Sequence, residues 1–270
     1  MRFQVDHDFH IHSSLSPCAG EAGKAQTPQR ILEYAKENGL SKILVTDHFW
    51  DSPVPGNVGW YQELGLNFEH LCKAKPLPQT EGVQFLFGCE TDMDQYFTIG
   101  VDRSHYDSFD FIIVPINHMH LAGISVPDRE IPLSERAELF VKRFQVLLDS
   151  DLPMHKTGLA HMTDSGLAPT WEAHIKVVDL IPDEAFLDLF RQTQQKGLGI
   201  ELNFRVNRYS PEELCRILRP YRLAKECGCK FYLGSDAHSP DAFEGMRENF
   251  EQIVDLLALE ETDKFLLPTK

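Results

Sequence analysis

The stretch VDHDFHIH, residues 5–12, has the composition of a short strand and ends in the pair His10 and His12. Side chains two positions apart in a strand point to the same face, so both imidazoles are directed towards one point. An isolated His-x-His pair is more often packed or exposed than bound to a metal. The rest of the chain therefore decides whether this pair is a metal site.

Six further stretches have the same strand-like character, and they alternate with helical segments. The predicted strands cover residues 5–12, 42–48, 84–90, 110–116, 157–161, 199–203 and 231–235. Between them, helices are expected to begin at Thr27-Pro28, Ser134 and Ser210-Pro211 and to end at Gly39 and Gly197. The segment 239–260 is expected to form the last helix. About seven strand–helix alternations in 270 residues predict an α/β fold, a closed parallel barrel with one domain over 1–270. Residues 50–81 are expected to form an irregular excursion on one rim.

The composition excludes several classes of protein. Hydrophobic residues make up 42% and charged residues 25%, as in ordinary globular proteins, and no apolar run reaches membrane-spanning length. The chain starts in a strand pattern without a signal-like apolar segment, so we expect a cytoplasmic protein with reduced cysteines and no membrane partner. A net charge of −15 without a basic block argues against a nucleic-acid partner. A phosphorylated substrate stays compatible, because bound cations can supply positive charge.

Polar side chains suited to metal binding follow one predicted strand after another. They are His10 and His12, Asp47 and His48, Glu90, His118 and His120, His161, Asn203 and Arg205, and Asp236 and His238. The carboxyl ends of barrel strands form one face, where active sites lie, so these side chains are expected to cluster. Any one of them alone would be ordinary, but a random scatter of twelve histidines would not place so many at strand ends.

The residue types indicate which metals fit. Several imidazoles together with carboxylates suit zinc, iron or manganese rather than magnesium or calcium, which prefer oxygen ligands. More than four ligands exceed the needs of one tetrahedral zinc ion. We therefore expect two or three divalent transition-metal ions with a carboxylate between them.

The motifs together resemble the PHP (polymerase and histidinol phosphatase) superfamily. DFHIHSS is similar to its first motif, VTDHF to its second, GCETD to its glutamate motif, and GSDAHSP to its closing motif. INHMH and LAHMTD resemble its two single-histidine motifs, and the order is the same along the whole chain. The length and the segment IELNFR look most like the stand-alone histidinol-phosphatase branch.

This resemblance implies a distorted (β/α)7 barrel and a set of metal ligands. One ion is expected at His10, His12, Glu90 and Asp236, a second at Glu90, His118 and His161, and a third at His48, His238 and Cys18. Cys18 departs from the pattern, since histidinol phosphatases commonly have histidine there. A Cys18 thiolate can bind zinc or iron, but the position is equally compatible with an empty third site or with a structural cysteine.

The expected reaction is hydrolysis of a small phosphomonoester, with L-histidinol phosphate of histidine biosynthesis as the leading substrate. A hydroxide held between two metal ions supplies the nucleophile, and the metals with an arginine offset the phosphate charge. The expected catalytic residues are Glu90, Asp236, Arg205 and His238, and the expected substrate contacts are Arg205, Asn203, His120 and Arg208. Arg205 is the predicted phosphate clamp, because it directly follows a strand.

Other functions stay in competition. Another phosphorylated metabolite or nucleotide fits the same motifs. An amidohydrolase would also carry His-x-His, but that class normally has a metal-bridging lysine after the fourth strand, where this chain has NHMH. A non-catalytic metal-binding module would be expected to lack several ligands, and only Cys18 departs from the set. The oligomeric state is not predicted.

Overall fold

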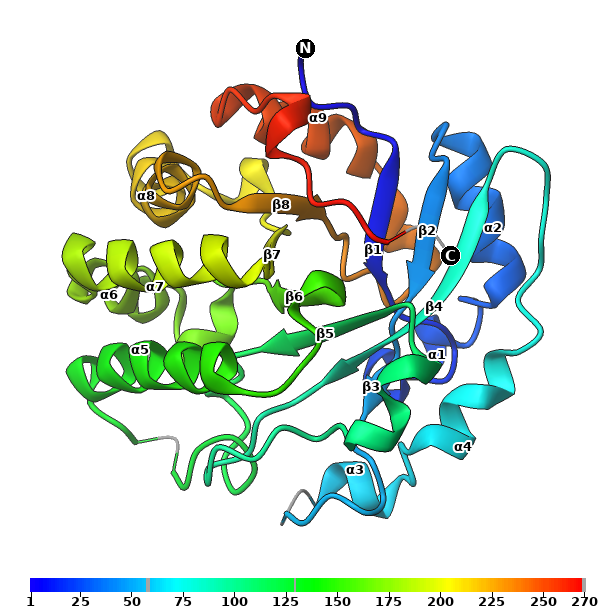
Figure 1. The fold of residues 1–270 in the computed structure, drawn as a ribbon, viewed down its shortest axis with the longest axis horizontal. Helices are drawn as coiled ribbons and strands as arrows, with labels where there is room; N and C mark the ends of the chain where they lie inside the picture. Colours follow the sequence, from blue (N-terminus) through cyan, green and yellow to red (C-terminus); the bar gives the residue numbers. More distant parts are fainter. Residues whose placement is uncertain (57–58, 129, 269–270) are drawn as a thin grey trace.

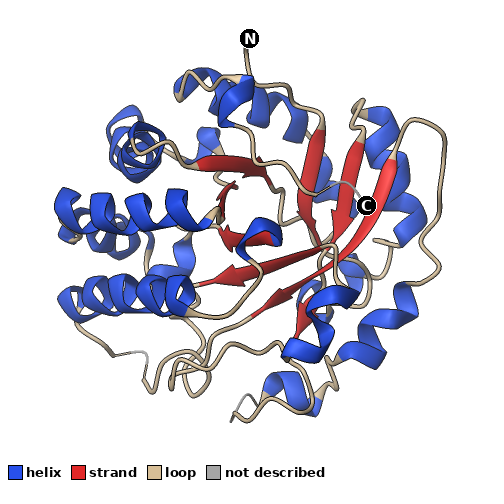
Figure 2. Cartoon of the chain, in the orientation of Figure 1, coloured by secondary structure: helices blue, strands red, loops and turns tan. Residues whose placement is uncertain are grey.

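Parallel strands pair side by side around a nearly closed barrel (Figures 1 and 2). This computed structural model describes residues 1–56, 59–128 and 130–268. The strands, in order around the barrel, are β1 (His7–Ile11), β2 (Lys42–Val45), β4 (Gln84–Thr91), β5 (Phe111–Pro115), β6 (Thr157–Ala160), β7 (Gly199–Leu202) and β8 (Lys230–Leu233). A two-residue strand, β3 (His48–Phe49), pairs with the end of β4. The predicted α/β class and the seven-stranded parallel barrel are confirmed.

The first and last strands close the barrel through a seam that differs from the other strand pairs. The Leu233 amide donates to Nε2 of His7 at 3.0 Å, and the Ser235 amide donates to Oδ1 of Asp8 at 3.0 Å. Two side chains of β1 thus take the place of main-chain partners. Beyond Asp8, residues 10–12 bond directly to the main chain that follows β8.

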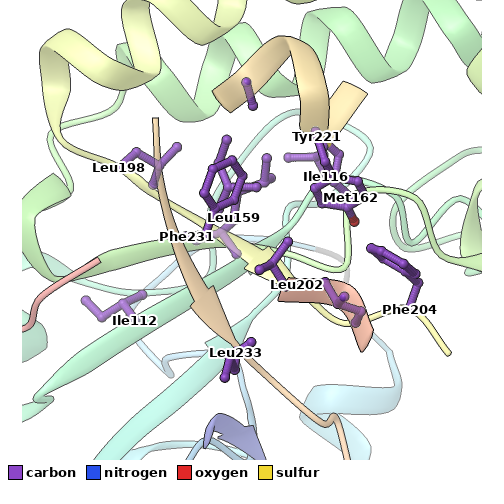
Figure 3. Packing of buried hydrophobic residues seen from close by; sticks show 14 of the residues in the cluster. Ile112, Ile116, Leu159, Met162, Leu198, Leu202, Phe204, Tyr221, Phe231 and Leu233 are labelled. Carbon is purple, nitrogen blue, oxygen red and sulfur yellow. The ribbon is translucent and has the colours of Figure 1, made fainter. Parts of the chain in front are cut away.

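Hydrophobic side chains pack in two layers, one inside the barrel and one outside. Along β5, Phe111 and Ile113 belong to the inner cluster, whereas Ile112 and Val114 belong to the outer one, as the two-residue period of a strand requires. The inner cluster consists of Phe9, Leu44, Phe111, Ile113, Ala160, Tyr232, Phe265 and Leu267. Figure 3 shows part of the outer cluster, between the strands and the helices. The barrel interior is filled, which leaves the strand ends for chemistry.

The helices surround the strands (Figure 2). They are α1 (Gly20–Gly23), α2 (Pro28–Glu37), α3 (Trp60–Glu63), α4 (Phe68–Leu71), α5 (Leu133–Asp149), α6 (Trp171–Leu180), α7 (Asp183–Lys196), α8 (Pro211–Glu226) and α9 (Met246–Leu256). Thr27 caps α2 by accepting from the Arg30 amide, Gly197 ends α7 at φ +76°, and Ser210 caps α8, as predicted. Among the described residues no helix is both long and apolar enough to span a membrane.

The structure differs from the predicted elements in three places. The strand expected at 42–48 is interrupted, because the Asp47 carboxylate turns away to accept hydrogen bonds from Ser13. The helix expected at 239–260 is divided at Gly245, which has φ +65°. Helix α6 was not predicted from the sequence.

Candidate metal centre

The carboxyl ends of the strands bring most of the predicted ligands into one buried cluster. A bulge in β1 directs its end to the cluster: Phe9 packs inside the barrel and Ile11 outside, and the register shifts between Asp8 and Ile11. Beside the cluster lies a cavity of about 480 Å3. It is lined by Cys18, His48, Trp60, Tyr61, Glu90, His118, His120, Leu121, His161, Asp164, Asp236 and His238.

Glu90 lies at the centre of the cluster and is 1% exposed. Its Oε2 is 2.8 Å from Nδ1 of His48 and 3.3 Å from Nε2 of His12. Its Oε1 is 3.0 Å from Nε2 of His161 and 3.9 Å from Nε2 of His118. A single carboxylate therefore faces imidazoles from several strand ends, which is the placement that bridging of two ions requires.

Asp236 approaches the same histidines from the other side of the seam. Its Oδ1 is 3.1 Å from Nε2 of His12, 3.4 Å from Nε2 of His10 and 3.5 Å from Nδ1 of His238. The residue has φ +52°, a left-handed conformation that aspartate tolerates better than most residues. The Asp236 carboxylate thus joins the cluster at the cost of local backbone strain.

The second ring nitrogen of four histidines is held by a polar partner. Nδ1 of His10 bonds to Glu201 at 2.7 Å, that of His12 to Ser16 at 2.9 Å, that of His118 to Asp92 at 3.0 Å, and that of His161 to Asn117 at 2.9 Å. Such partners fix the tautomer and the ring orientation of a metal-binding histidine. In each ring, Nε2 is thus the nitrogen through which an ion could bind.

These orienting residues were not predicted from the sequence. Glu201 is fully buried within β7, and a single carboxylate inside a strand pattern gives no local signal of its role. Asn117 and Asp92 are direct or near neighbours of predicted ligands in the motifs INHMH and GCETD. That adjacency is the one signal from which they could have been identified.

Electrostatics at the cluster favour ionised carboxylates. Burial alone would raise the pKa of Glu90, but the positive charges of His48 and His10 hold it well below its usual range. Burial and the charges of His238 and His48 lower the pKa of His12 to about 4. The ionised carboxylates thus need positive charge beside them. His12, with its lowered pKa, is neutral at neutral pH.

The donor atoms are spaced as metal ligands are. Atoms that bind one ion at about 2.0–2.2 Å in tetrahedral geometry lie roughly 3.3 Å from each other. Nε2 of His10 and Nε2 of His12 are 3.1 Å apart, close to that spacing. Oε2 of Glu90 and Nδ1 of His48 are buried and 2.8 Å apart, yet neither makes a hydrogen bond with a described residue. The residues present fit transition-metal ions.

Cys18 lies beside the third expected ion. Cys18 is exposed and lines the cavity together with His48 and His238, and His12, His48 and His238 form one of the groups whose donor atoms converge within 4.8 Å. Burial raises the pKa of the Cys18 thiol, but the imidazoles of His48 and His238 outweigh that effect and lower it to about 7. Its placement is therefore that of a candidate thiolate ligand.

The predicted substrate contacts are not all at the cavity. His120 lines it. The Asn203 amide donates to the Gly234 carbonyl at 3.1 Å, and Arg208 is exposed in the turn after β7; neither is among the described residues that line the cavity.

Arg205 also lies outside the set of described residues that line the cavity. Its guanidinium donates to the main-chain carbonyls of Ala242 and Glu244, in the segment that precedes α9. The role of Arg205 as a phosphate clamp therefore stays a prediction.

Comparisons with known proteins support the fold. No protein-family model and no curated protein matches the chain. Among solved structures, histidinol phosphate phosphatase from Lactococcus lactis, determined with zinc, L-histidinol and phosphate, is 14% identical. The match covers 94% of each chain with a TM-score of 0.53.

Two other structures are less similar. PsfC from Pseudomonas syringae is 17% identical, with a TM-score of 0.41 over 87% of this chain and 76% of that one. A probable 2-pyrone-4,6-dicarboxylic acid hydrolase from Acinetobacter baumannii is 13% identical, with a TM-score of 0.40 over 96% and 97%. The likeness to the lactococcal enzyme shows that this chain shares its fold.

Proposed function

We propose that this protein is a metal-dependent hydrolase that cleaves a small phosphomonoester, with L-histidinol phosphate as the leading substrate. The observation that carries the proposal is the convergence of buried imidazoles and carboxylates around Glu90. The motif resemblance and the fold shared with the lactococcal phosphatase support the same choice of reaction.

The candidate ligands divide into three sets. We assign His10, His12, Glu90 and Asp236 to one ion, Glu90, His118 and His161 to a second, and His48, His238 and Cys18 to a third. Divalent ions bound there would make a water acidic at neutral pH and offset charge on phosphate oxygens. The protein supplies fixed ligands and a buried setting in which these charges interact strongly.

The cavity suits a small substrate. Its volume of about 480 Å3 lies within the range of roughly 300–1,000 Å3 typical of small-molecule sites. Trp60 and Leu121 contribute apolar surface to its wall. Burial and the charge of His118 lower the pKa of His120 to about 4, so its neutral ring can hydrogen-bond a substrate at neutral pH.

A hydrolysis screen tests the proposal. Phosphomonoesters including L-histidinol phosphate, a nucleotide phosphodiester and a cyclic amide are each incubated with zinc- or manganese-loaded protein. Release of phosphate from a monoester, abolished by a chelator, is the expected result. Hydrolysis of the amide alone would assign the site to the amidohydrolase type, and no hydrolysis of any ester would reject the phosphatase proposal.

We expect the purified protein to bind at least two transition-metal ions per chain. The reason is that the ligand atoms outnumber the needs of one ion and that Glu90 faces two groups of imidazoles. Elemental analysis after purification with added zinc and without chelator measures the number. One ion or none per chain would contradict a bridged centre.

Arg205→Ala distinguishes between two roles for Arg205, phosphate binding as predicted from the sequence and the main-chain contacts seen in the structure. Because the guanidinium bonds to the carbonyls of Ala242 and Glu244, we expect a loss of stability on the order of 1–2 kcal/mol. We expect catalytic efficiency, kcat/KM, to stay within about tenfold of wild type, or ~1.4 kcal/mol. Denaturant unfolding and steady-state kinetics are compared with those of Arg208→Ala. If catalytic efficiency instead fell by about 100-fold or more while stability was unchanged, the clamp assignment would be restored.

A further inference from the structure

Arg143 of α5 is fully buried and binds the main chain of two loops. Its Nε donates to the Ile116 carbonyl at 2.8 Å and Nη2 to the Met93 carbonyl at 2.7 Å. Its Nη1 donates to the carbonyls of Ser125 at 3.0 Å and Asp94 at 3.3 Å. Burial lowers the pKa of the guanidinium to about 10, so it is charged at neutral pH.

The four carbonyls belong to the two loops that follow β4 and β5, next to the candidate ligands Glu90 and His118. Met93 and Asp94 follow β4 shortly after Glu90. Ile116 directly follows β5, and Ser125 lies in the same loop as His118. One side chain therefore joins the loop that follows Glu90 to the loop of His118.

The residue that orients His118 lies in the same loop as two of these carbonyls. Oδ2 of the buried Asp92 accepts from Nδ1 of His118 at 3.0 Å and from the Tyr61 hydroxyl at 2.8 Å. Arg143 bonds to the carbonyl of Met93, the residue directly after Asp92, and so holds the main chain beside the carboxylate that orients the His118 ring.

We propose that Arg143 is a positioning residue for the ion expected at Glu90, His118 and His161. It holds the loops after β4 and β5 at the separation that lets Glu90 and His118 face the same ion. This inference rests on the metal centre of the proposed function, but it does not depend on which substrate is cleaved.

The test compares zinc binding by Arg143→Met with that by Lys142→Met. Lys142 is the adjacent residue on α5, is exposed, and places its Nζ 4.2 Å from the centre of the Phe97 ring, so its substitution removes a charge from the same helix at the surface. Metal-free protein is titrated with zinc in a calorimeter, and unfolding is followed with and without zinc. We expect Arg143→Met to lower the affinity for at least one zinc ion per chain by about 10–100-fold. Loss of a residue that orients a metal ligand has an effect of this size in other metalloproteins. We also expect it to show a smaller zinc-induced rise in melting temperature, and Lys142→Met to match wild type in both.

Arg143→Lys keeps the test decisive if the methionine variant does not fold. Lysine retains the charge but replaces the planar group of five donors with a single ammonium, so zinc affinity is expected between those of wild type and Arg143→Met. Wild-type zinc affinity and stoichiometry in the folded variants, with only the metal-free protein destabilised, would overturn the proposal and leave Arg143 a purely structural residue. The titration contains no substrate, so failure of the proposed phosphatase activity appears separately, in the hydrolysis screen.

Discussion

Glu90→Gln is expected to abolish hydrolysis while leaving the barrel folded. The Glu90 carboxylate presents one oxygen to His48 and His12 and the other to His161 and His118. An amide of the same shape carries no charge and offers one oxygen, so it cannot hold two ions at a shared spacing. We expect catalytic efficiency to fall by at least about 100-fold, or about 2.7 kcal/mol of transition-state stabilisation, and at least one ion per chain to be lost.

Glu81→Gln provides a matched control, because Glu81 is exposed before β4 and its substitution makes the same chemical change. Elemental analysis, circular dichroism and kinetics are measured on both variants. Turnover by Glu90→Gln within about tenfold of wild type, a difference of only ~1.4 kcal/mol, would mean that Glu90 does not bridge the ions.

Glu201→Gln is expected to weaken metal binding although Glu201 faces no ion directly. Its Oε1 accepts from Nδ1 of His10 at 2.7 Å, and its Oε2 accepts from the His161 amide at 2.5 Å. A glutamine amide can donate to Nδ1, which would place the proton of His10 on Nε2 and remove the lone pair that an ion needs. We expect a loss of about 10–100-fold in zinc affinity and a parallel fall in catalytic efficiency.

Gly234→Ala tests the same contact without changing a charged group. A Cβ at Gly234 would lie 1.9 Å from Oε1 of Glu201 and 2.7 Å from Cβ of His10, so the methyl group must displace the carboxylate. Both variants are titrated with zinc alongside Glu212→Gln, which changes an exposed carboxylate on α8. Unchanged zinc affinity in both would show that the His10 ring is oriented without Glu201.

The sequence predicts the places of the candidate ligands because two regularities act together. Side chains alternate along a strand, and the carboxyl ends of parallel strands meet at one face. Those two facts suffice to expect His10, Glu90, His161 and Asp236 close together, and the structure places them so. They depend on local pattern and general barrel geometry, which are visible without a structure.

The orienting residues depend on contacts between distant strands and are not visible in that way. Glu201 contacts His10, 191 positions away, and Arg143 bonds to carbonyls whose positions follow only from the folded loops. The contacts of Arg205 are a further example that the pattern does not reveal. The chain turns after β7 into a short 3-10 helix (Val206–Arg208), so a residue that follows the strand by sequence binds Ala242 and Glu244 instead of facing the cavity.

The seam between β1 and β8 would couple metal binding to the closure of the barrel. His10 and His12 stand on one side of it and Asp236 and His238 on the other, next to the stretch where the side chains of His7 and Asp8 replace main-chain partners. An ion bound to residues on both sides would link the first strand of the chain to the last. Opening of the barrel and release of the ion would then be one coupled equilibrium, and each tenfold excess of free metal over its dissociation constant would add about 1.4 kcal/mol to the stability of the closed form.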